Sequence, residues 1–109
     1  MLNPIVTLTQ RYMDVLATRQ KLAASNIANA DTPGYHTRDV DFASALSSSF
    51  GPPSGTEVQG LQTKPDGNNV SLEREARNLA ENALKFQIAS QFVQNQIRLT
   101  RAAIQEGRS

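Results

Sequence analysis

The sequence predicts an all-α fold in which long N- and C-terminal helices form an antiparallel coiled-coil hairpin, joined by an irregular or disordered insert rich in Gly, Pro and Ser. Three observations predict it: helical spacing of apolar residues near the N-terminus, a 3.5-residue apolar repeat near the C-terminus, and helix-breaking residues between them. The 109 residues suffice for one small domain. We expect an N-terminal segment 1–46, a flexible insert 47–69 and a C-terminal helix 70–109, with the two helices forming one domain.

The N-terminal segment carries the apolar pattern of one helical face. Pro4 suits the first turn of a helix, because the N–H that it lacks has no partner there. Pro33 disfavours helical geometry at Thr32, and Gly34 follows it. These signals predict a helix from about residue 4 to residue 29. Its apolar face consists of Ile5, Leu8, Tyr12, Val15, Leu16, Leu22, Ala23 and Ile27.

The insert is rich in residues that interrupt regular structure. Gly, Pro and Ser supply 11 of the 23 residues from 47 to 69. The run 51–55, Gly-Pro-Pro-Ser-Gly, cannot continue a helix or lie at the centre of a sheet. The run 64–67, Lys-Pro-Asp-Gly, places Pro and Gly where a tight turn needs them. We therefore expect a loop.

The C-terminal helix has the most regular apolar pattern of the chain. Spacings of four and three alternate for more than four heptads, which is typical of a coiled-coil seam. Ser71 can cap the start of this helix. The predicted seam consists of Leu72, Ala76, Leu79, Ala83, Phe86, Ser90, Val93, Ile97, Thr100 and Ile104.

A second apolar row lies beside this seam and widens the apolar surface beyond what one antiparallel helix can cover. Two helices alone rarely bury enough apolar area to offset the chain entropy lost on folding. We therefore expect other subunits to cover the remaining surface, and a helical bundle closed within one chain is the alternative. The second row consists of Ala80, Leu84, Ile88, Phe92, Leu99 and Ala103.

Composition excludes several classes of function. A net charge of +1 lacks the positive field that nucleic acids or anionic membranes attract. The chain has no cysteine, no apolar stretch long enough to span a bilayer and no cleaved-signal pattern at its N-terminus. His36 with Asp31, Asp39 and Asp41 is the one cluster of metal-ligand or acid–base character, and we interpret it as a solvated or interface cluster. We expect no catalytic, cofactor-binding or metal-binding residue.

The segment 22–35 reads Leu-Ala-Ala-Ser-Asn-Ile-Ala-Asn-Ala-Asp-Thr-Pro-Gly-Tyr. Asn26 and Asn29 lie three residues apart on one helical face, where their amides can bond the backbone of the last turn or of a neighbour. The run 32–35 fits a type II turn, with Pro33 at its second position and Gly34 at its third.

This string resembles the signature of flagellar basal-body rod and hook proteins, in which Ala-x-Asn-(Ile/Leu)-Ala-Asn-x-x-Thr-Pro-Gly-(Tyr/Phe) follows an N-terminal helix. The runs 38–42, 66–75 and 82–87 are similar to the proximal-rod members of that family. The resemblance covers about residues 2–46 and 66–107. It implies a structural subunit of the periplasmic rod of the flagellar basal body, not an enzyme, exported unfolded by the flagellar type III apparatus without a cleaved signal peptide.

The resemblance also implies partners. The terminal helices would line the export channel and contact other copies of this chain, the rod proteins FlgC and FlgF, the basal-body adaptor FliE and the export apparatus, without nucleic acid or direct membrane insertion. A free-standing helical adaptor that binds a partner helix, or another rod protein of the family such as FlgC, is the alternative. The expected assembly interface comprises Leu8, Tyr12, Val15, Leu22, Asn26, Asn29, Pro33, Gly34, Leu79, Phe86, Val93, Ile97 and Ile104.

Overall fold

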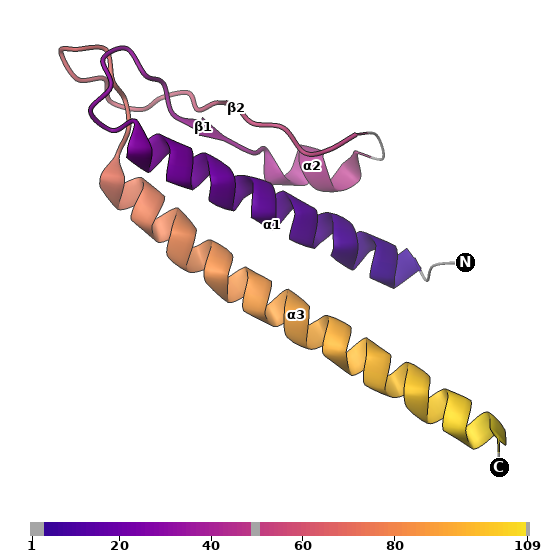
Figure 1. The fold of residues 1–109 in the computed structure, drawn as a ribbon. Helices are drawn as coiled ribbons and strands as arrows, with labels where there is room; N and C mark the ends of the chain where they lie inside the picture. The colour runs from indigo at the N-terminus through magenta and orange to yellow at the C-terminus, as the bar shows by residue number, and fades with distance from the viewer. Residues whose placement is uncertain (1–3, 49–50, 109) are drawn as a thin grey trace.

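The computed structural model describes residues 4–48 and 51–108, which form an elongated body of 70 × 26 × 18 Å (Figure 1). Two long helices dominate it, and a smaller layer of loop, short strands and one short helix lies along the first of them. In chain order the elements are α1 (Pro4–Ala28), β1 (Arg38–Asp39), α2 (Phe42–Ser47), β2 (Thr56–Glu57) and α3 (Leu72–Arg108). None of the described helices combines the length and hydropathy that crossing a bilayer requires.

Both predicted long helices are confirmed, and their ends follow the predicted signals. After α1 the chain turns at Gly34, whose φ of 74° favours glycine, and the Tyr35 N–H donates to the Thr32 carbonyl at 3.2 Å. The Ser71 hydroxyl accepts from the Arg74 N–H at 3.2 Å and so caps α3, as its position predicts.

The two long helices pack against each other. Arg19 hydrogen bonds Asn78, and the Asn82 amide donates to the Leu16 carbonyl at 2.7 Å. Further along, Val6 and Phe92 line one groove, so the contacts move toward the start of α1 as α3 advances. Coiled-coil geometry between these helices stays a prediction.

The face of α3 that is buried against α1 lies beside the predicted seam and is largely polar. Its buried positions precede seam positions by one residue, because the polar side chains there bond partners on α1 and β1 while the apolar row turns toward the flank. Phe86, Ile97 and Ile104 of the seam are 41%, 48% and 51% exposed. The buried residues of α3 are Glu75, Asn78, Asn82 and Ala89.

The middle of the chain contains regular structure that the sequence did not indicate. β1 pairs antiparallel with β2, with Arg38 opposite Glu57 and Asp39 opposite Thr56. Asp41 caps α2 by accepting from the Ser44 hydroxyl at 3.1 Å. The fold is therefore mostly helical, with a two-stranded ladder laid on α1.

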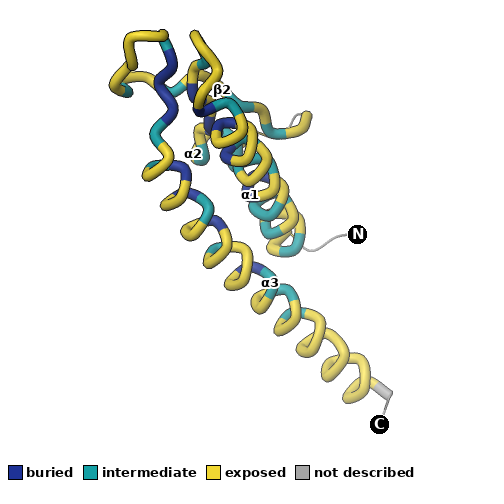
Figure 2. The backbone as a smooth tube through the Cα atoms, turned by 60° about the vertical axis from the view of Figure 1, so that its left-hand side comes forward, coloured by how far each residue is buried: buried dark blue, intermediate teal, exposed yellow. Residues whose placement is uncertain are grey.

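Burial is uneven along the long axis (Figure 2). Buried residues concentrate where α1 ends and α3 begins, whereas the last third of α3 is exposed in every described side chain but Gln96 and Val93, which are half-buried. We call residues 29–37 and 60–73 the turn end, and residues 94–108 the free end.

Candidate assembly interface

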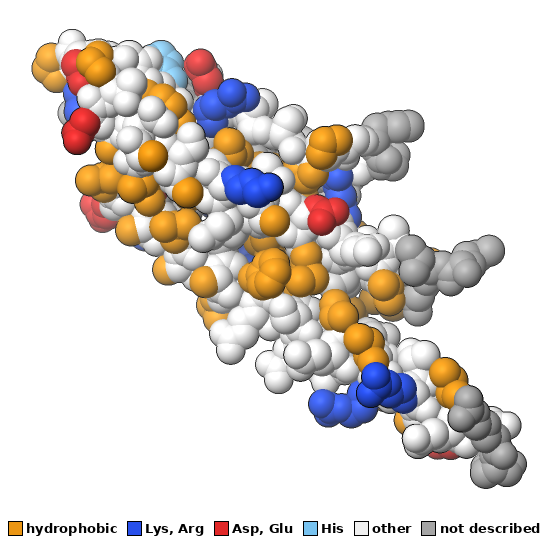
Figure 3. All heavy atoms as spheres, in the orientation of Figure 1, with side chains coloured by type: hydrophobic (Ala, Val, Ile, Leu, Met, Phe, Trp, Pro, Cys, Tyr) orange, Lys and Arg blue, Asp and Glu red, His pale blue; other side chains and the backbone are white. Residues whose placement is uncertain are grey.

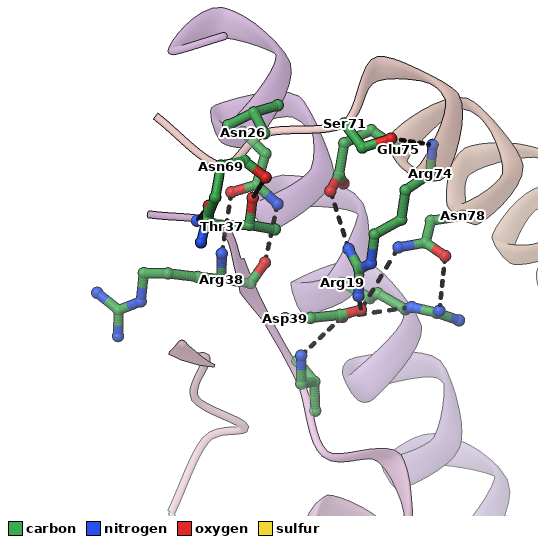
Figure 4. A network of polar contacts seen from close by, with 12 residues as sticks. Arg19, Asn26, Thr37, Arg38, Asp39, Asn69, Ser71, Arg74, Glu75 and Asn78 are labelled. Atoms are coloured by element: carbon green, nitrogen blue, oxygen red, sulfur yellow. Dashed lines mark hydrogen bonds and ion pairs between the residues drawn. The ribbon is translucent and has the colours of Figure 1, made fainter. Parts of the chain in front are cut away.

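A cluster of charged side chains joins α1, β1 and α3 near the turn end (Figure 4). Asp39 accepts from Arg74 at 2.8 Å through Oδ2 and lies 3.4 Å from Arg19 Nε through Oδ1. Asn78 completes the ring, because it accepts from Arg19 at 2.9 Å and donates to Asp39 at 3.4 Å. Arg74 also donates to the fully buried Glu75 at 2.9 Å. Two arginines and two carboxylates balance in charge, so we call this set the charge junction.

Two asparagine side chains anchor the turn that follows α1. Asn26 is buried, and it donates to the Arg38 carbonyl at 2.8 Å and accepts from the Arg38 N–H at 3.2 Å and the Tyr35 hydroxyl at 3.0 Å. Asn29 donates to the Ser25 carbonyl at 2.9 Å. The prediction that these amides bond the backbone near the last turn of the helix is therefore confirmed.

A second pair of asparagines, which sequence reasoning placed in the flexible insert, binds the same turn from the other side. Asn68 is fully buried and donates to the carbonyls of Asn29 at 2.9 Å and Thr32 at 2.8 Å, which lie beyond the end of α1. The Asn69 side chain accepts from the Thr37 N–H at 2.6 Å. We call residues 66–70 the clasp.

Glycine is required where the clasp meets the turn. Gly67 has a φ of 86°, and a Cβ on it would lie 3.3 Å from the Gly34 Cα. The Gly34 N–H also donates to the Asp66 carbonyl at 2.9 Å. The Thr-Pro-Gly-Tyr motif and the Asp-Gly-Asn-Asn run, far apart in sequence, thus form one backbone-to-backbone unit. Their Gly and Asn content was the signal that could have linked them.

The predicted interface residues fall into three groups by burial. Val15 and Asn26 are buried within the chain, where they support the packing of α1. The half-buried group is Tyr12, Leu22, Asn29, Leu79 and Val93, and the exposed group is Leu8, Pro33, Gly34, Phe86, Ile97 and Ile104.

Beyond the charge junction, apolar side chains lie open to solvent along α3 (Figure 3). A groove of about 570 Å³ between α1 and α3 is lined in part by Leu16, Ala83 and Phe86, and a second of about 320 Å³ opens between Val6 and Phe92. Large exposed apolar patches mark interaction sites in soluble proteins. The exposed large side chains of α3 are Leu72, Leu84, Phe86, Ile88, Phe92, Ile97, Leu99 and Ile104.

The histidine cluster does not come together as a metal site. His36 lies 3.5 Å from Glu57, both exposed, while Asp39 belongs to the charge junction and Asp41 caps α2. No group of three His, Cys, Asp or Glu among residues 4–48 and 51–108 could hold a metal ion.

Comparison with known proteins agrees with the motif. The family model described as flagella basal body rod protein matches residues 10–36, which include Asn26, Asn29 and the turn at Gly34. The flagellar basal body rod protein FlgB of Yersinia enterocolitica is 34% identical over 90% of this chain and 91% of its own length. FlgB of Salmonella typhimurium (33%) and of Escherichia coli K12 (30%) each match over 97% of this chain and 96% of their own length. The chain therefore belongs to the FlgB family of flagellar basal body rod proteins.

Proposed function

We propose that this chain is a structural subunit of the proximal rod of the flagellar basal body, and that it assembles by coiled-coil packing of α1 and α3 with neighbouring rod subunits. The observation that carries the proposal is the row of exposed apolar side chains on α3, from Leu84 to Ile104, which the chain's own α1 does not cover. Burial of such side chains contributes about 25 cal/mol per Å² of apolar surface removed from water.

The charge junction supports the same proposal. Asp39, Arg19 and Arg74 bond one another inside the chain, so the junction fixes the two helices at one end and leaves their apolar flanks free. Neutral polar side chains, including Gln87, Gln91 and Gln94, occupy exposed positions among the apolar residues of α3. Such side chains can be buried against a neighbour at lower cost than charged ones.

Family membership supports the finer parts of the proposal. Other copies, the rod proteins FlgC and FlgF, the adaptor FliE and the flagellar type III export apparatus are the proposed partners. The proposed location is the periplasmic rod, reached by export without a cleaved signal peptide. The proposed role is structural and not enzymatic.

The test is the replacement of Phe86 or Val93 by Asp, compared with Arg77→Asp as the control. We expect Phe86→Asp and Val93→Asp to abolish incorporation into rods, because a carboxylate in a packed interface must lose its water without gaining a partner. Phe86 is 41% exposed in the single chain, so this change leaves the fold of the subunit intact. Arg77 is exposed and lies off the predicted seam, so its replacement should leave rods intact.

The measurement is the number of basal bodies with complete rods, in cells that secrete each variant at matched levels. Rods built by Phe86→Asp as well as by the Arg77→Asp control would contradict the proposed interface. A single closed complex with one partner, in place of a continuous array, would instead favour the free-standing adaptor.

A further inference from the structure

The two ends of the elongated body differ in charge (Figure 3). The turn end exposes Asp31, Asp66 and Glu73 beside the apolar Leu72, which is 58% exposed. Among the described residues, no ion pair involves Asp31 or Glu73. Lys64 is the one cation within this end, and its ammonium group donates to the Ala30 carbonyl at 3.3 Å. The turn end therefore combines an acidic surface with an exposed leucine.

The free end has the opposite character. Arg98 and Arg101 lie three residues apart and exposed on α3, and with Ile97 they line a shallow groove of about 270 Å³. No ion pair within the described part of the chain involves either arginine. From Asn82 to Gln105 the helix carries no acidic residue, so no carboxylate on this stretch of α3 neutralises them. The free end therefore combines two guanidinium groups with the exposed Ile97 and Ile104.

We infer that the free end of one copy docks on the turn end of the next copy, with Arg98 and Arg101 facing Asp31 and Glu73 and the flanking apolar residues in contact. The inference rests on the proposed function and assigns one contact within it. The occupant is a second copy because a single chain carries both complementary surfaces, at opposite ends of a 70 Å body. Such a contact joins two different surfaces, so it does not close on itself and can extend into an array.

Arginine suits this contact physically. Its planar guanidinium pairs a carboxylate through two hydrogen bonds, which fixes orientation as well as distance. Complementary charge also speeds encounter and disfavours the two wrong pairings, free end on free end and turn end on turn end, because like charges would then meet.

The cysteine-free sequence allows a direct test by cross-linking. Cells would co-express two full-length forms, one with Glu73→Cys and one with Arg101→Cys, and isolated basal bodies would be oxidised. We expect a disulfide-linked dimer of the two forms. The matched control pairs Asp14→Cys with Lys21→Cys, which are exposed on α1 away from both ends, and should give little product.

Charge reversal gives an independent measurement. Arg98→Glu with Arg101→Glu, or Asp31→Arg with Glu73→Arg, should lower the amount of the chain in basal bodies by about tenfold or more, because like charges would then face each other. All four changes in one chain should restore most of the incorporation. The reversals Asp14→Arg and Lys21→Glu, as controls, should have little effect.

The outcomes separate the inference from the proposed function. Chain present in basal bodies without the 73–101 cross-link, or without rescue by the fourfold swap, overturns the end-to-end contact and leaves the rod subunit assignment standing. A 101-cysteine cross-link to a protein of another mass overturns the second copy as occupant. Absence of the unmodified chain from basal bodies overturns the proposed function and the inference together.

Discussion

The turn end and the open half of the molecule hold their residues in place by different means. Near the turn end, polar side chains such as Asp39 and Asn68 are buried and bonded to partners from other segments. Along the later part of α3, large apolar side chains such as Ile88 and Leu99 are 61% and 63% exposed. The chain thus uses directional polar contacts for its own fold and leaves non-directional apolar surface for neighbours.

This division has a physical reason. Hydrogen bonds and ion pairs in a buried cluster contribute modest net stability, but they specify one geometry, because each lost partner leaves a desolvated group behind. Apolar contacts contribute most of the free energy of association and tolerate several arrangements. A subunit that must present its helices at a defined angle before it meets neighbours benefits from the first kind at the turn end.

The largest predicted effect comes from removing the carboxylate at the centre of the charge junction. Asp39→Ala leaves the guanidinium groups of Arg19 and Arg74 without their shared partner, in a site where their side chains are 15% and 19% exposed. Breaking such a buried pair costs about 3–5 kcal/mol. We expect the isolated protein to lose the amide-exchange protection of the turn-end halves of α1 and α3.

Asp14→Ala is the matched control, because Asp14 is an exposed carboxylate on α1. It should leave exchange rates unchanged within error. If Asp39→Ala keeps wild-type protection, the charge junction does not hold the helices together. Slow exchange over residues 94–108 in a demonstrated wild-type monomer would contradict the comparison itself.

The clasp provides the next largest effect. Asn68→Ala removes the donor to the Asn29 and Thr32 carbonyls and the acceptor of the Val70 N–H. Buried backbone groups left without partners cost about 1–3 kcal/mol. We expect a loss of unfolding free energy of that size in urea titrations. The control is Gln62→Ala, an exposed change in the same loop, and an equal loss in both variants would show that the clasp contributes nothing specific.

Local signals explain how much of the fold could be predicted. The predicted helix over 4–29 and the observed α1 agree within a residue, because Pro4, Pro33 and Gly34 act on their own backbone. The start of α3 followed from Ser71 for the same reason. Asn26 and Asn29 could be assigned to the turn because their partners lie within about a dozen residues.

The remaining contacts depend on residues far apart in sequence. Periodicity identified an apolar row on α3 but not which row meets α1, and the chain places the polar row of Asn78 and Asn82 there. Arg19 interrupts the buried face that contains Leu16 and Ala23, which signals a charged partner. Its identity as Asp39 required the β1 segment to be placed first. The burial of Asn68 was hidden by the Gly- and Pro-rich composition around it.

The smallest predicted effect tests where the charge junction ends along α3. Glu81 accepts a hydrogen bond from Lys85, and this bond, the lysine charge and the nearby Arg19 lower the pKa of Glu81 below its usual value. A lowered pKa in the folded state adds stability above the ordinary glutamate pKa, and that stability is lost as pH falls through the lowered value. Because the Glu81 side chain is 49% exposed, Glu81→Gln should cost only about 0.2–0.5 kcal/mol at neutral pH. Urea titrations of both proteins should show this difference at neutral pH, less of it in high salt, and none once the carboxylate of the parent protein is protonated. A loss above about 1 kcal/mol that persists in acid would instead place Glu81 inside the charge junction, and the boundary between the two regions would move one turn toward the free end.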